Sequence, residues 1–365
     1  MATCLSLTLL CSCGDFLDEK VYSFAEGNTL FANASNTEKA LTGAYDALNA
    51  NAIQNQAPHA LFSRNIHLLT QLGCDEMIGR TDYIGIADIK PFCNYTYNSE
   101  SRFLGDAWFA LYAGIYRANG VIENAPKVAD MTDERRKEVV LEARFLRGFY
   151  YTYLAWFWGG VPLQKSVNDS ELTPRSSLKD VYELIINDLK SAYEGLPERN
   201  TYDSRANKYT AAAMLAKVYL YLAACKENNV GADLNFTLNS FDWVDSNALY
   251  TEAKTLCADI QTLITAETGH PAFITIDQEG GAVSRLAEDY YNVPGAMALA
   301  ATGDEMNAYT AGKITGEILH AHGVNFDLSP VLDVNSNPHN PVIGVRSYGD
   351  EPTLVGCYGL QMVRG

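Results

Sequence analysis

Apolar residues recur every three to four positions in several segments between residues 36 and 255, the spacing that gathers them on one face of an α-helix. The two clearest segments run over residues 104–122 and 135–158. Three more follow over 178–196, 210–225 and 247–264. The pattern predicts a first part of the chain built almost wholly from helices.

Capping signals agree with the breaks between these segments. Thr132 precedes one helix and Ser177 another, and a hydroxyl at the N-cap accepts a backbone hydrogen bond of the first turn. Gly159 and Gly160 end the 135–158 segment, since glycine is favoured just past a helix C-terminus. Helix pairs of this length resemble tetratricopeptide-type stacking, although no strict 34-residue period is visible.

The pattern changes near residue 270. A short apolar, β-branched run ends in Asp277, and a second strand-like run over 325–333 ends in Asp333. Residues 304–321 read as a helix between them, which is the β-α-β order of a parallel sheet. We place the boundary between 250 and 265. The predicted domains are 1–20 as signal and tether, 21–255 as a helical domain, and 256–365 as an α/β segment.

Composition excludes several classes of function. The 365 residues carry 27 basic and 44 acidic side chains, a net charge of −17, which argues against a nucleic-acid partner. The eight cysteines include no CxxC pair, and His320 and His322 lack a carboxylate partner, so we read them as surface residues. The sequence indicates no metal site and no cofactor. No apolar run approaches the ~20 residues that span a bilayer.

The N-terminal residues carry a possible anchor. Leu10-Cys-Ser-Cys13 follows a short apolar stretch, and it resembles the end of a bacterial lipoprotein signal in which Cys13 receives the lipid. The first basic residue is Lys20, so the usual positive start is absent. The alternatives are a buried N-terminal strand or an unprocessed tail. We expect membrane attachment by the lipid alone.

Several blocks of the first part resemble the SusD/RagB family of nutrient-uptake lipoproteins. The most specific is Glu-Ala-Arg-Phe-Leu-Arg-Gly-Phe-Tyr-Tyr at 142–151, which runs on to Trp-Gly-Gly-Val-Pro-Leu at 158–163. The other blocks, in the family's order, are 13–18, 36–45, 108–119, 174–197 and 208–219. The resemblance covers residues 13 to about 250.

This resemblance implies an all-helical, surface-exposed lipoprotein of the outer membrane. Such proteins bind glycans and cover a TonB-dependent transporter. Aromatic faces stack on sugar rings, but we expect the 156–158 aromatic cluster to pack in the core rather than to serve as a sugar platform. The family's glycan site draws on a later part of the chain, so no glycan-contact residue is carried over from it.

The second part resembles glycoside hydrolase family 3, in its β-N-acetylhexosaminidase branch. The resemblance rests on Ile-Asp-Gln-Glu-Gly-Gly-Ala-Val-Ser-Arg-Leu at 276–286 and on blocks at 294–304, 323–335 and 340–350. It implies part of a TIM barrel. It also implies that Asp277 holds sugar hydroxyls and that Arg285 and Arg346 help to bind the substrate. The alternative for Asp277 is a turn cap. For Glu279 we favour a turn or supporting carboxylate.

No catalytic residue is assigned. In this family the nucleophile and the acid/base residue come later in the barrel. The sequence stops at Gly365, before both, so we expect no turnover. The expected fold is therefore mainly α, a tetratricopeptide-like scaffold, followed by a partial α/β TIM-barrel segment.

Three hypotheses stay open for the function. They are an outer-membrane lipoprotein that binds a glycan or amino-sugar oligosaccharide beside a TonB-dependent transporter, a glycoside hydrolase, and a chimeric or truncated reading frame.

Overall fold

A computed structural model describes residues 27–48, 61–72, 89–170, 172–202, 204–232, 236–286 and 292–365. The candidate lipidation residue Cys13 lies outside them. The chain divides into two compact units, Met1–Ile260 and Gln261–Gly365. The finer limits expected from the sequence, at 20 and 255, stay predictions.

The first unit is helical. Its α-helices are α1 (Gly27–Leu30), α2 (Ala34–Asp46), α3 (Ile66–Gln71), α4 (Lys90–Cys93), α5 (Arg102–Asn124), α6 (Asp133–Trp158), α7 (Leu178–Gly195), α8 (Lys208–Glu227) and α9 (Ser246–Thr268), the last of which runs on past residue 260. A π-helical turn covers Leu61–Asn65, and 3-10 turns cover Ala125–Lys127 and Thr237–Asn239.

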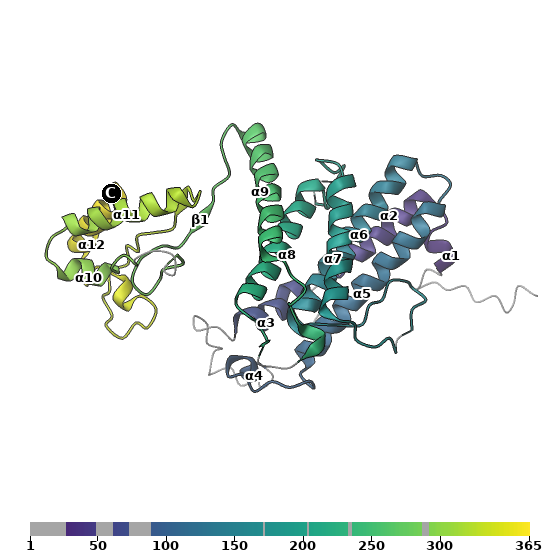
Figure 1. Cartoon of the computed structure of the whole chain (residues 1–365), viewed down its shortest axis with the longest axis horizontal. Helices are drawn as coiled ribbons and strands as arrows, with labels where there is room; N and C mark the ends of the chain where they lie inside the picture. The colour runs from purple at the N-terminus through teal and green to yellow at the C-terminus, as the bar shows by residue number, and fades with distance from the viewer. Residues whose placement is uncertain are drawn as a thin grey trace, which may run out of the picture. The chain divides into compact units, whose positions relative to one another are not determined.

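Helices that follow one another along the chain pack side by side (Figure 1). α5 packs on α6, α6 on α7 and α7 on α8, while α2 returns to both α5 and α6. Their shared core is made of large apolar side chains that exclude solvent, among them Leu111, Ile115, Leu146, Tyr150, Tyr151, Leu154, Tyr182, Ile185 and Leu189. The predicted helical class of this part is confirmed.

Local sequence explains where these helices begin and end. The Thr132 hydroxyl accepts a hydrogen bond from the Arg135 amide at 3.2 Å, and Ser177 accepts one from the Asp180 amide at 3.1 Å. At the end of α6, Gly159 has φ +69°, where a Cβ would also lie 2.4 Å from the Asn239 side-chain oxygen. The caps expected from the sequence are therefore present.

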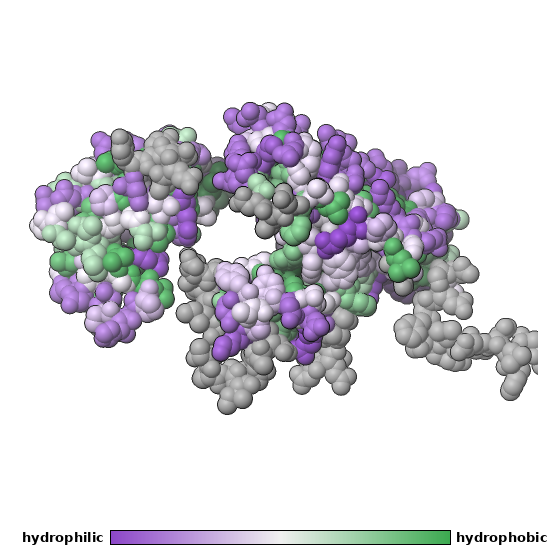
Figure 2. Space-filling model, turned by 60° about the horizontal axis from the view of Figure 1, so that its bottom comes forward, coloured by the Kyte–Doolittle hydropathy of each residue, from purple (hydrophilic) through white to green (hydrophobic). Residues whose placement is uncertain are grey.

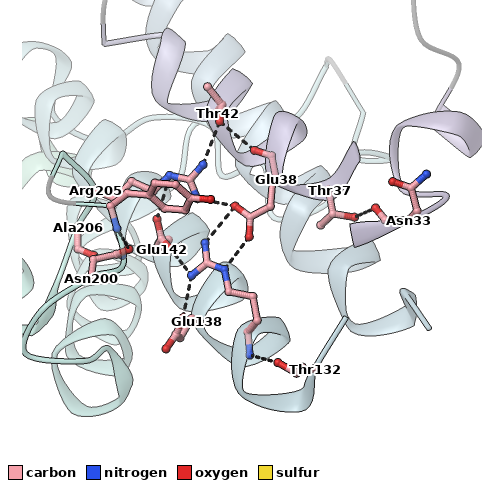
Figure 3. A network of polar contacts seen from close by, with 12 residues as sticks. Asn33, Thr37, Glu38, Thr42, Thr132, Glu138, Glu142, Asn200, Arg205 and Ala206 are labelled. Carbon is pink, nitrogen blue, oxygen red and sulfur yellow. Dashed lines mark hydrogen bonds and ion pairs between the residues drawn. The ribbon is translucent and has the colours of Figure 1, made fainter. Parts of the chain in front are cut away.

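A buried network of charges joins α2 to α6 and to the segment before α8 (Figure 3). The Arg135 guanidinium donates to both carboxylate oxygens of Glu38, at 2.6 and 3.1 Å, and lies 3.1 Å from Glu142. Arg205 also pairs with Glu38, at 2.6 Å. The Tyr45 hydroxyl donates to Glu142 at 3.0 Å. Two arginines thus hold two carboxylates from elements far apart in the sequence.

The pKa values of the two carboxylates in this network shift in opposite directions. Burial raises the pKa of Glu38, but the hydrogen bonds and charges of Arg135 and Arg205 outweigh it, so that pKa is lowered. Glu142 is fully buried, and there burial dominates over the same two arginines and raises the pKa. Ionised Glu38 therefore stabilises the fold, whereas the charge on Glu142 costs free energy.

The second unit contains a short parallel pair of strands with helices around it. β1 (Thr275–Ile276) pairs with β2 (Phe326–Asp327), Thr275 opposite Phe326 and Ile276 opposite Asp327. Its α-helices are α10 (Ala296–Ala301), α11 (Met306–Ala321) and α12 (Pro352–Arg364), and a 3-10 turn covers Gly344–Arg346. The β-α-β order matches the sequence pattern, although the paired stretches are shorter than expected. The barrel implied by the resemblance stays a prediction.

A small core holds the second unit together, formed where α10 and α11 meet α12 and the segment before it. It contains Val293, Ala296, Leu299, Ala308, Ala311, Tyr348, Val355, Tyr358 and Met362. Other apolar side chains of this unit are exposed, such as Phe273 at 76% and Leu332 at 58%. Figure 2 shows apolar residues between polar ones on the face of this unit that is in view. None of the helices described is long and apolar enough to cross a bilayer.

Candidate functional site

The strand ends of the second unit place Asp277, one of the residues expected at the site, beside other acidic side chains. Asp277 follows β1 directly, and Asp327 ends β2 beside it. Asp327 accepts a hydrogen bond from the Gln278 amide at 3.0 Å. Burial raises the pKa of Asp327, and the nearby charges of Asp277 and Glu279 raise it further. Acidic side chains thus gather at the carboxyl edge of this parallel pair.

Arg346 is fixed at this edge by Glu279. Its guanidinium donates to the two Glu279 oxygens at 2.9 and 2.7 Å, and to the Val342 carbonyl at 3.2 Å. The Glu279 side chain is only 8% exposed, whereas that of Arg346 is 30% exposed. The bond to Glu279 raises the pKa of Arg346, and the charges of Asp277 and Asp333 act in the same direction. Arg346 is therefore a pre-oriented cation that solvent can reach.

Two glycines shape the loop after Glu279. Gly280 has φ +80°, and a Cβ on it would lie 2.6 Å from the Val293 carbonyl oxygen. Gly281 has φ +59°, and a Cβ there would lie 2.8 Å from the Gly295 Cα. Both positions thus require glycine, for conformation and for the close approach of the neighbouring backbone.

A cavity of about 360 Å³ opens beside the Glu279–Arg346 pair. This volume is within the range of small-molecule sites. Its walls are mostly apolar, and Glu279 and Arg346 supply the charges. The other lining residues are Gly280, Gly281, Ala282, Gly295, Ala296, Met297, Ala298, Ala301, Pro330, Val331, Val345 and Tyr348. Such a cavity can hold the apolar face of a small molecule while its charged rim binds hydroxyl or carbonyl groups.

Three residues are expected here from the sequence, and the structure places them differently. Arg346 lines the cavity. Asp277 stands next to the pair without lining the cavity, and the described residues offer its carboxylate no hydrogen-bond donor that would make it a turn cap. Arg285 lies on the following loop with an exposed side chain, and its backbone amide donates to the Gln278 side chain at 2.8 Å.

Two further residues contribute to the site, and Gln278 was not assigned from the sequence. Glu279, expected as a turn or supporting carboxylate, is the partner of Arg346. Gln278 is buried, and it donates to Ser284 at 2.8 Å while it accepts from Arg285, so it holds the loop in place. Both lie within the block at 276–286, but their partners become visible only in the folded chain.

The other residues considered from the sequence do not line this cavity. The aromatic cluster at the end of α6 packs against the core of the first unit, and the Trp108 and Trp158 rings meet edge to face at 5.2 Å. His320 and His322 are exposed. Among the residues that the structure describes, no group of His, Cys, Asp or Glu is arranged to hold a metal ion.

Two family profiles match this chain in succession. The family described as "Starch-binding associating with outer membrane", which is SusD-like, matches residues 15–220, and the glycosyl hydrolase family 3 N-terminal domain matches 221–365. The limit between the matches falls inside α8 (Lys208–Glu227). Since α8 packs on α7, the structural division comes later, at residue 260.

Similar proteins include relatives of both kinds. A SusD-like protein of Bacteroides ovatus is 30% identical over 220 residues, which is 58% of this chain and 37% of that protein. SusD-like protein P25 of Formosa agariphila is 25% identical over 238 residues, 61% of this chain and 42% of the relative. Beta-hexosaminidase A of Pseudoalteromonas piscicida is 43% identical over 98 residues, 26% of this chain and 16% of the relative.

A solved SusD superfamily structure from Bacteroides vulgatus shares the fold, with a TM-score of 0.50 at 22% identity over 63% of this chain and 43% of that one. The chain spans less than half the length of these relatives. Because the SusD-like match covers more than half of its 365 residues, the chain belongs to the SusD-like family, and it carries a glycoside hydrolase family 3 N-terminal segment after that match.

Proposed function

We propose that this chain is an outer-membrane nutrient-uptake lipoprotein that binds an amino-sugar glycan and works beside a TonB-dependent transporter. The observation that carries the proposal is the Glu279–Arg346 pair at the mouth of a cavity of about 360 Å³. This pair lies in a segment similar to hexosaminidases that follows a SusD-like unit. In this proposal the second unit is the first part of a TIM barrel that contributes sugar recognition.

Each side chain has a definite role in the proposed site. Asp277 accepts hydrogen bonds from sugar hydroxyls, since the described residues leave its carboxylate without a donor. Arg346 donates to hydroxyl or acetamido oxygens through the N–H groups that Glu279 does not occupy. Arg285 closes the site from the neighbouring loop. The apolar walls take the sugar's C–H face, as sugar-binding sites commonly do.

Calorimetric titration tests this site. We expect N-acetylglucosamine oligomers to bind the purified chain and cellobiose to bind weakly or not at all. Asp277→Asn removes a charge without breaking a described hydrogen bond, so we expect it to lower affinity about tenfold or more, the loss of a charge-assisted contact.

The matched control is Asp350→Asn, an exposed acid of the same unit that lies before α12 and not at the end of β1, and it should bind like wild type. Equal affinity of wild type and Asp277→Asn would remove Asp277 from the site.

Glycoside hydrolysis is the second candidate, favoured by the 43% identity to a hexosaminidase. Retaining hydrolysis needs a nucleophilic carboxylate and an acid/base group on either side of the glycosidic bond. The assay is release of p-nitrophenol from p-nitrophenyl N-acetyl-β-glucosaminide. Release by wild type but not by Asp277→Asn would favour the enzyme over the binding protein, whereas binding without release favours the first proposal.

Lipid attachment is the part of the proposal that concerns Cys13. Radiolabelled palmitate should enter the wild-type protein in a bacterial host that processes lipoproteins, because the lipid is transferred to this thiol. Cys13→Ala should lose the label, and Cys11→Ala, two residues earlier, should keep it. Equal labelling of wild type and Cys13→Ala would assign the anchor elsewhere.

A further inference from the structure

A second cavity, of about 420 Å³, lies on the first unit between α1–α2 and the C-terminal half of α5. Its volume also falls within the range of ligand sites. It is lined by Leu30, Phe31, Lys39, Ala40, Gly43, Tyr116, Arg117, Gly120, Asn124 and Val167. None of these residues belongs to the site already described. The cavity combines aromatic rings with two cations.

One of the lining residues is a glycine of α5. A Cβ on Gly120 would stand 3.7 Å from the Phe31 ring and 3.8 Å from Val167. One turn earlier on the helix, Tyr116 is 59% exposed, although it is a large aromatic side chain. The cavity is therefore lined by a solvent-accessible aromatic ring together with apolar side chains, a combination that suits the C–H face of a sugar ring.

Two cations border the same space. Arg117 donates to the Gly43 carbonyl at 2.8 Å and lies 3.6 Å from Asp46, whose side chain is 67% exposed. For Lys39, the described part of the chain supplies no carboxylate within ion-pair distance. Most of the Arg117 N–H groups and the Lys39 ammonium are thus available to a ligand.

The net charge of the whole chain makes the two cations beside this cavity informative. With a net charge of −17, the chain as a whole repels anions. No carboxylate lines this cavity, although acidic residues outnumber basic ones in the chain by 44 to 27. A local cationic site on an acidic protein selects anions that approach this one place.

We propose that this cavity binds an anionic sugar unit of a glycan, with its carboxylate or sulfate ester on Lys39 and Arg117 and its ring on Tyr116. This rests on the proposed glycan-binding function, and it adds a second site with its own substrate class. A uronate and a sulfated sugar share this chemistry, because both place an anionic group beside a pyranose ring.

Calorimetric titration with three probes tests the inference: trigalacturonic acid, a monosulfated galactan disaccharide, and neutral galactotriose. We expect one or both acidic probes to bind and galactotriose to bind at least tenfold more weakly, about the loss of one charge-assisted contact. Which acidic probe binds identifies the anionic group. Binding should weaken as NaCl rises from about 50 to about 500 mM, because salt screens exposed charges.

The chain offers a matched pair of variants for this test. Tyr116→Ala should lower affinity for the acidic probe about tenfold. Phe109→Ala removes an equally exposed aromatic of the same helix, 56% against 59%, that does not line the cavity, and it should change affinity by less than about twofold. Lys39→Gln should reduce both affinity and its dependence on salt.

Three outcomes would overturn the inference. Galactotriose could bind as well as the acidic probes, or Phe109→Ala could weaken binding as much as Tyr116→Ala does. Alternatively, no probe binds but Tyr116→Ala abolishes co-purification with a transporter, which would make the cavity a protein contact.

The same titrations distinguish a failure of this inference from a failure of the proposed function. Binding of N-acetylglucosamine oligomers alone would sink this inference and leave the proposed function standing, whereas binding of neither class would sink both. Retention of acidic-probe binding by Asp277→Asn would show that the two sites are distinct.

Discussion

At the scale of single residues, Gly114 shows how one missing side chain permits the packing of two helices. A Cβ there would lie 2.5 Å from the ring of Tyr150, which is fully buried. We therefore expect Gly114→Ala to destabilise the protein by about 1–3 kcal/mol, because the close-packed ring cannot move aside. The measurement is the free energy of unfolding from urea titration followed by tryptophan fluorescence.

Gly105 is the control on the same helix. Nothing lies within 4 Å of a Cβ built on it, so Gly105→Ala should leave stability unchanged or raise it by up to about 1 kcal/mol through helix propensity. Equal destabilisation by both substitutions would show that helix α5 tolerates no added methyl group, and the argument from Tyr150 would fail.

The sequence allows some residue roles to be predicted and hides others. Thr132, Ser177 and Gly159 act on their own chain neighbours, so their capping roles are visible in the sequence. The Glu279–Arg346 pair joins residues 67 positions apart, and Gly114 matters only because Tyr150 packs on it. Such roles depend on which elements meet, and periodicity carries no information about that.

At the scale of elements, the network that holds α2 on α6 predicts how stability depends on pH. The pKa of Glu38 is lowered in the fold, so its contribution is present above its unfolded pKa, ordinarily 4.5, and is lost as pH falls through the lower folded value. The pKa of Glu142 is raised, so its ionisation costs stability as pH rises above 4.5. The ionisation of Glu38 therefore raises the stability of the fold, whereas the ionisation of Glu142 lowers it.

Neutral substitutions separate these contributions. Glu38→Gln should lower the free energy of unfolding at neutral pH by about 1–3 kcal/mol, because two arginines lose a charged partner. Glu142→Gln should cost less at neutral pH, and it should flatten the change in stability just above pH 4.5. Urea titrations at several pH values measure both. A larger loss for Glu142→Gln than for Glu38→Gln would contradict the assignment.

The long helices were predicted within a few residues because their apolar period is sustained over several turns. Two helices of the second unit are not predicted from the sequence: α10, whose six residues are too few to show a period, and α12 (Pro352–Arg364). The strands are shorter than the runs that predict them, since only residues 275–276 and 326–327 find a partner. Pairing depends on distant segments, which an apolar run alone does not reveal.

At the scale of the whole molecule, the two units have separate cores, and that of the second is much smaller. We expect the second unit to unfold at a lower urea concentration, because it buries less apolar surface. All four tryptophans lie in the first unit, at 108, 156, 158 and 243. Far-UV circular dichroism should therefore show an early transition that tryptophan fluorescence does not. Coincident curves would mean that the two units unfold as one.

The contact between Arg205 and Glu38 spans 167 residues of chain, and that between Arg135 and Glu38 spans 97. During synthesis α2 is therefore made first, but both of its charged partners arrive much later. α5 and α6, on which α2 packs, are complete once residue 158 has been added, but the Glu38 carboxylate gains its second arginine only with Arg205. The first long helix to be translated is thus among the last to have its polar contacts completed.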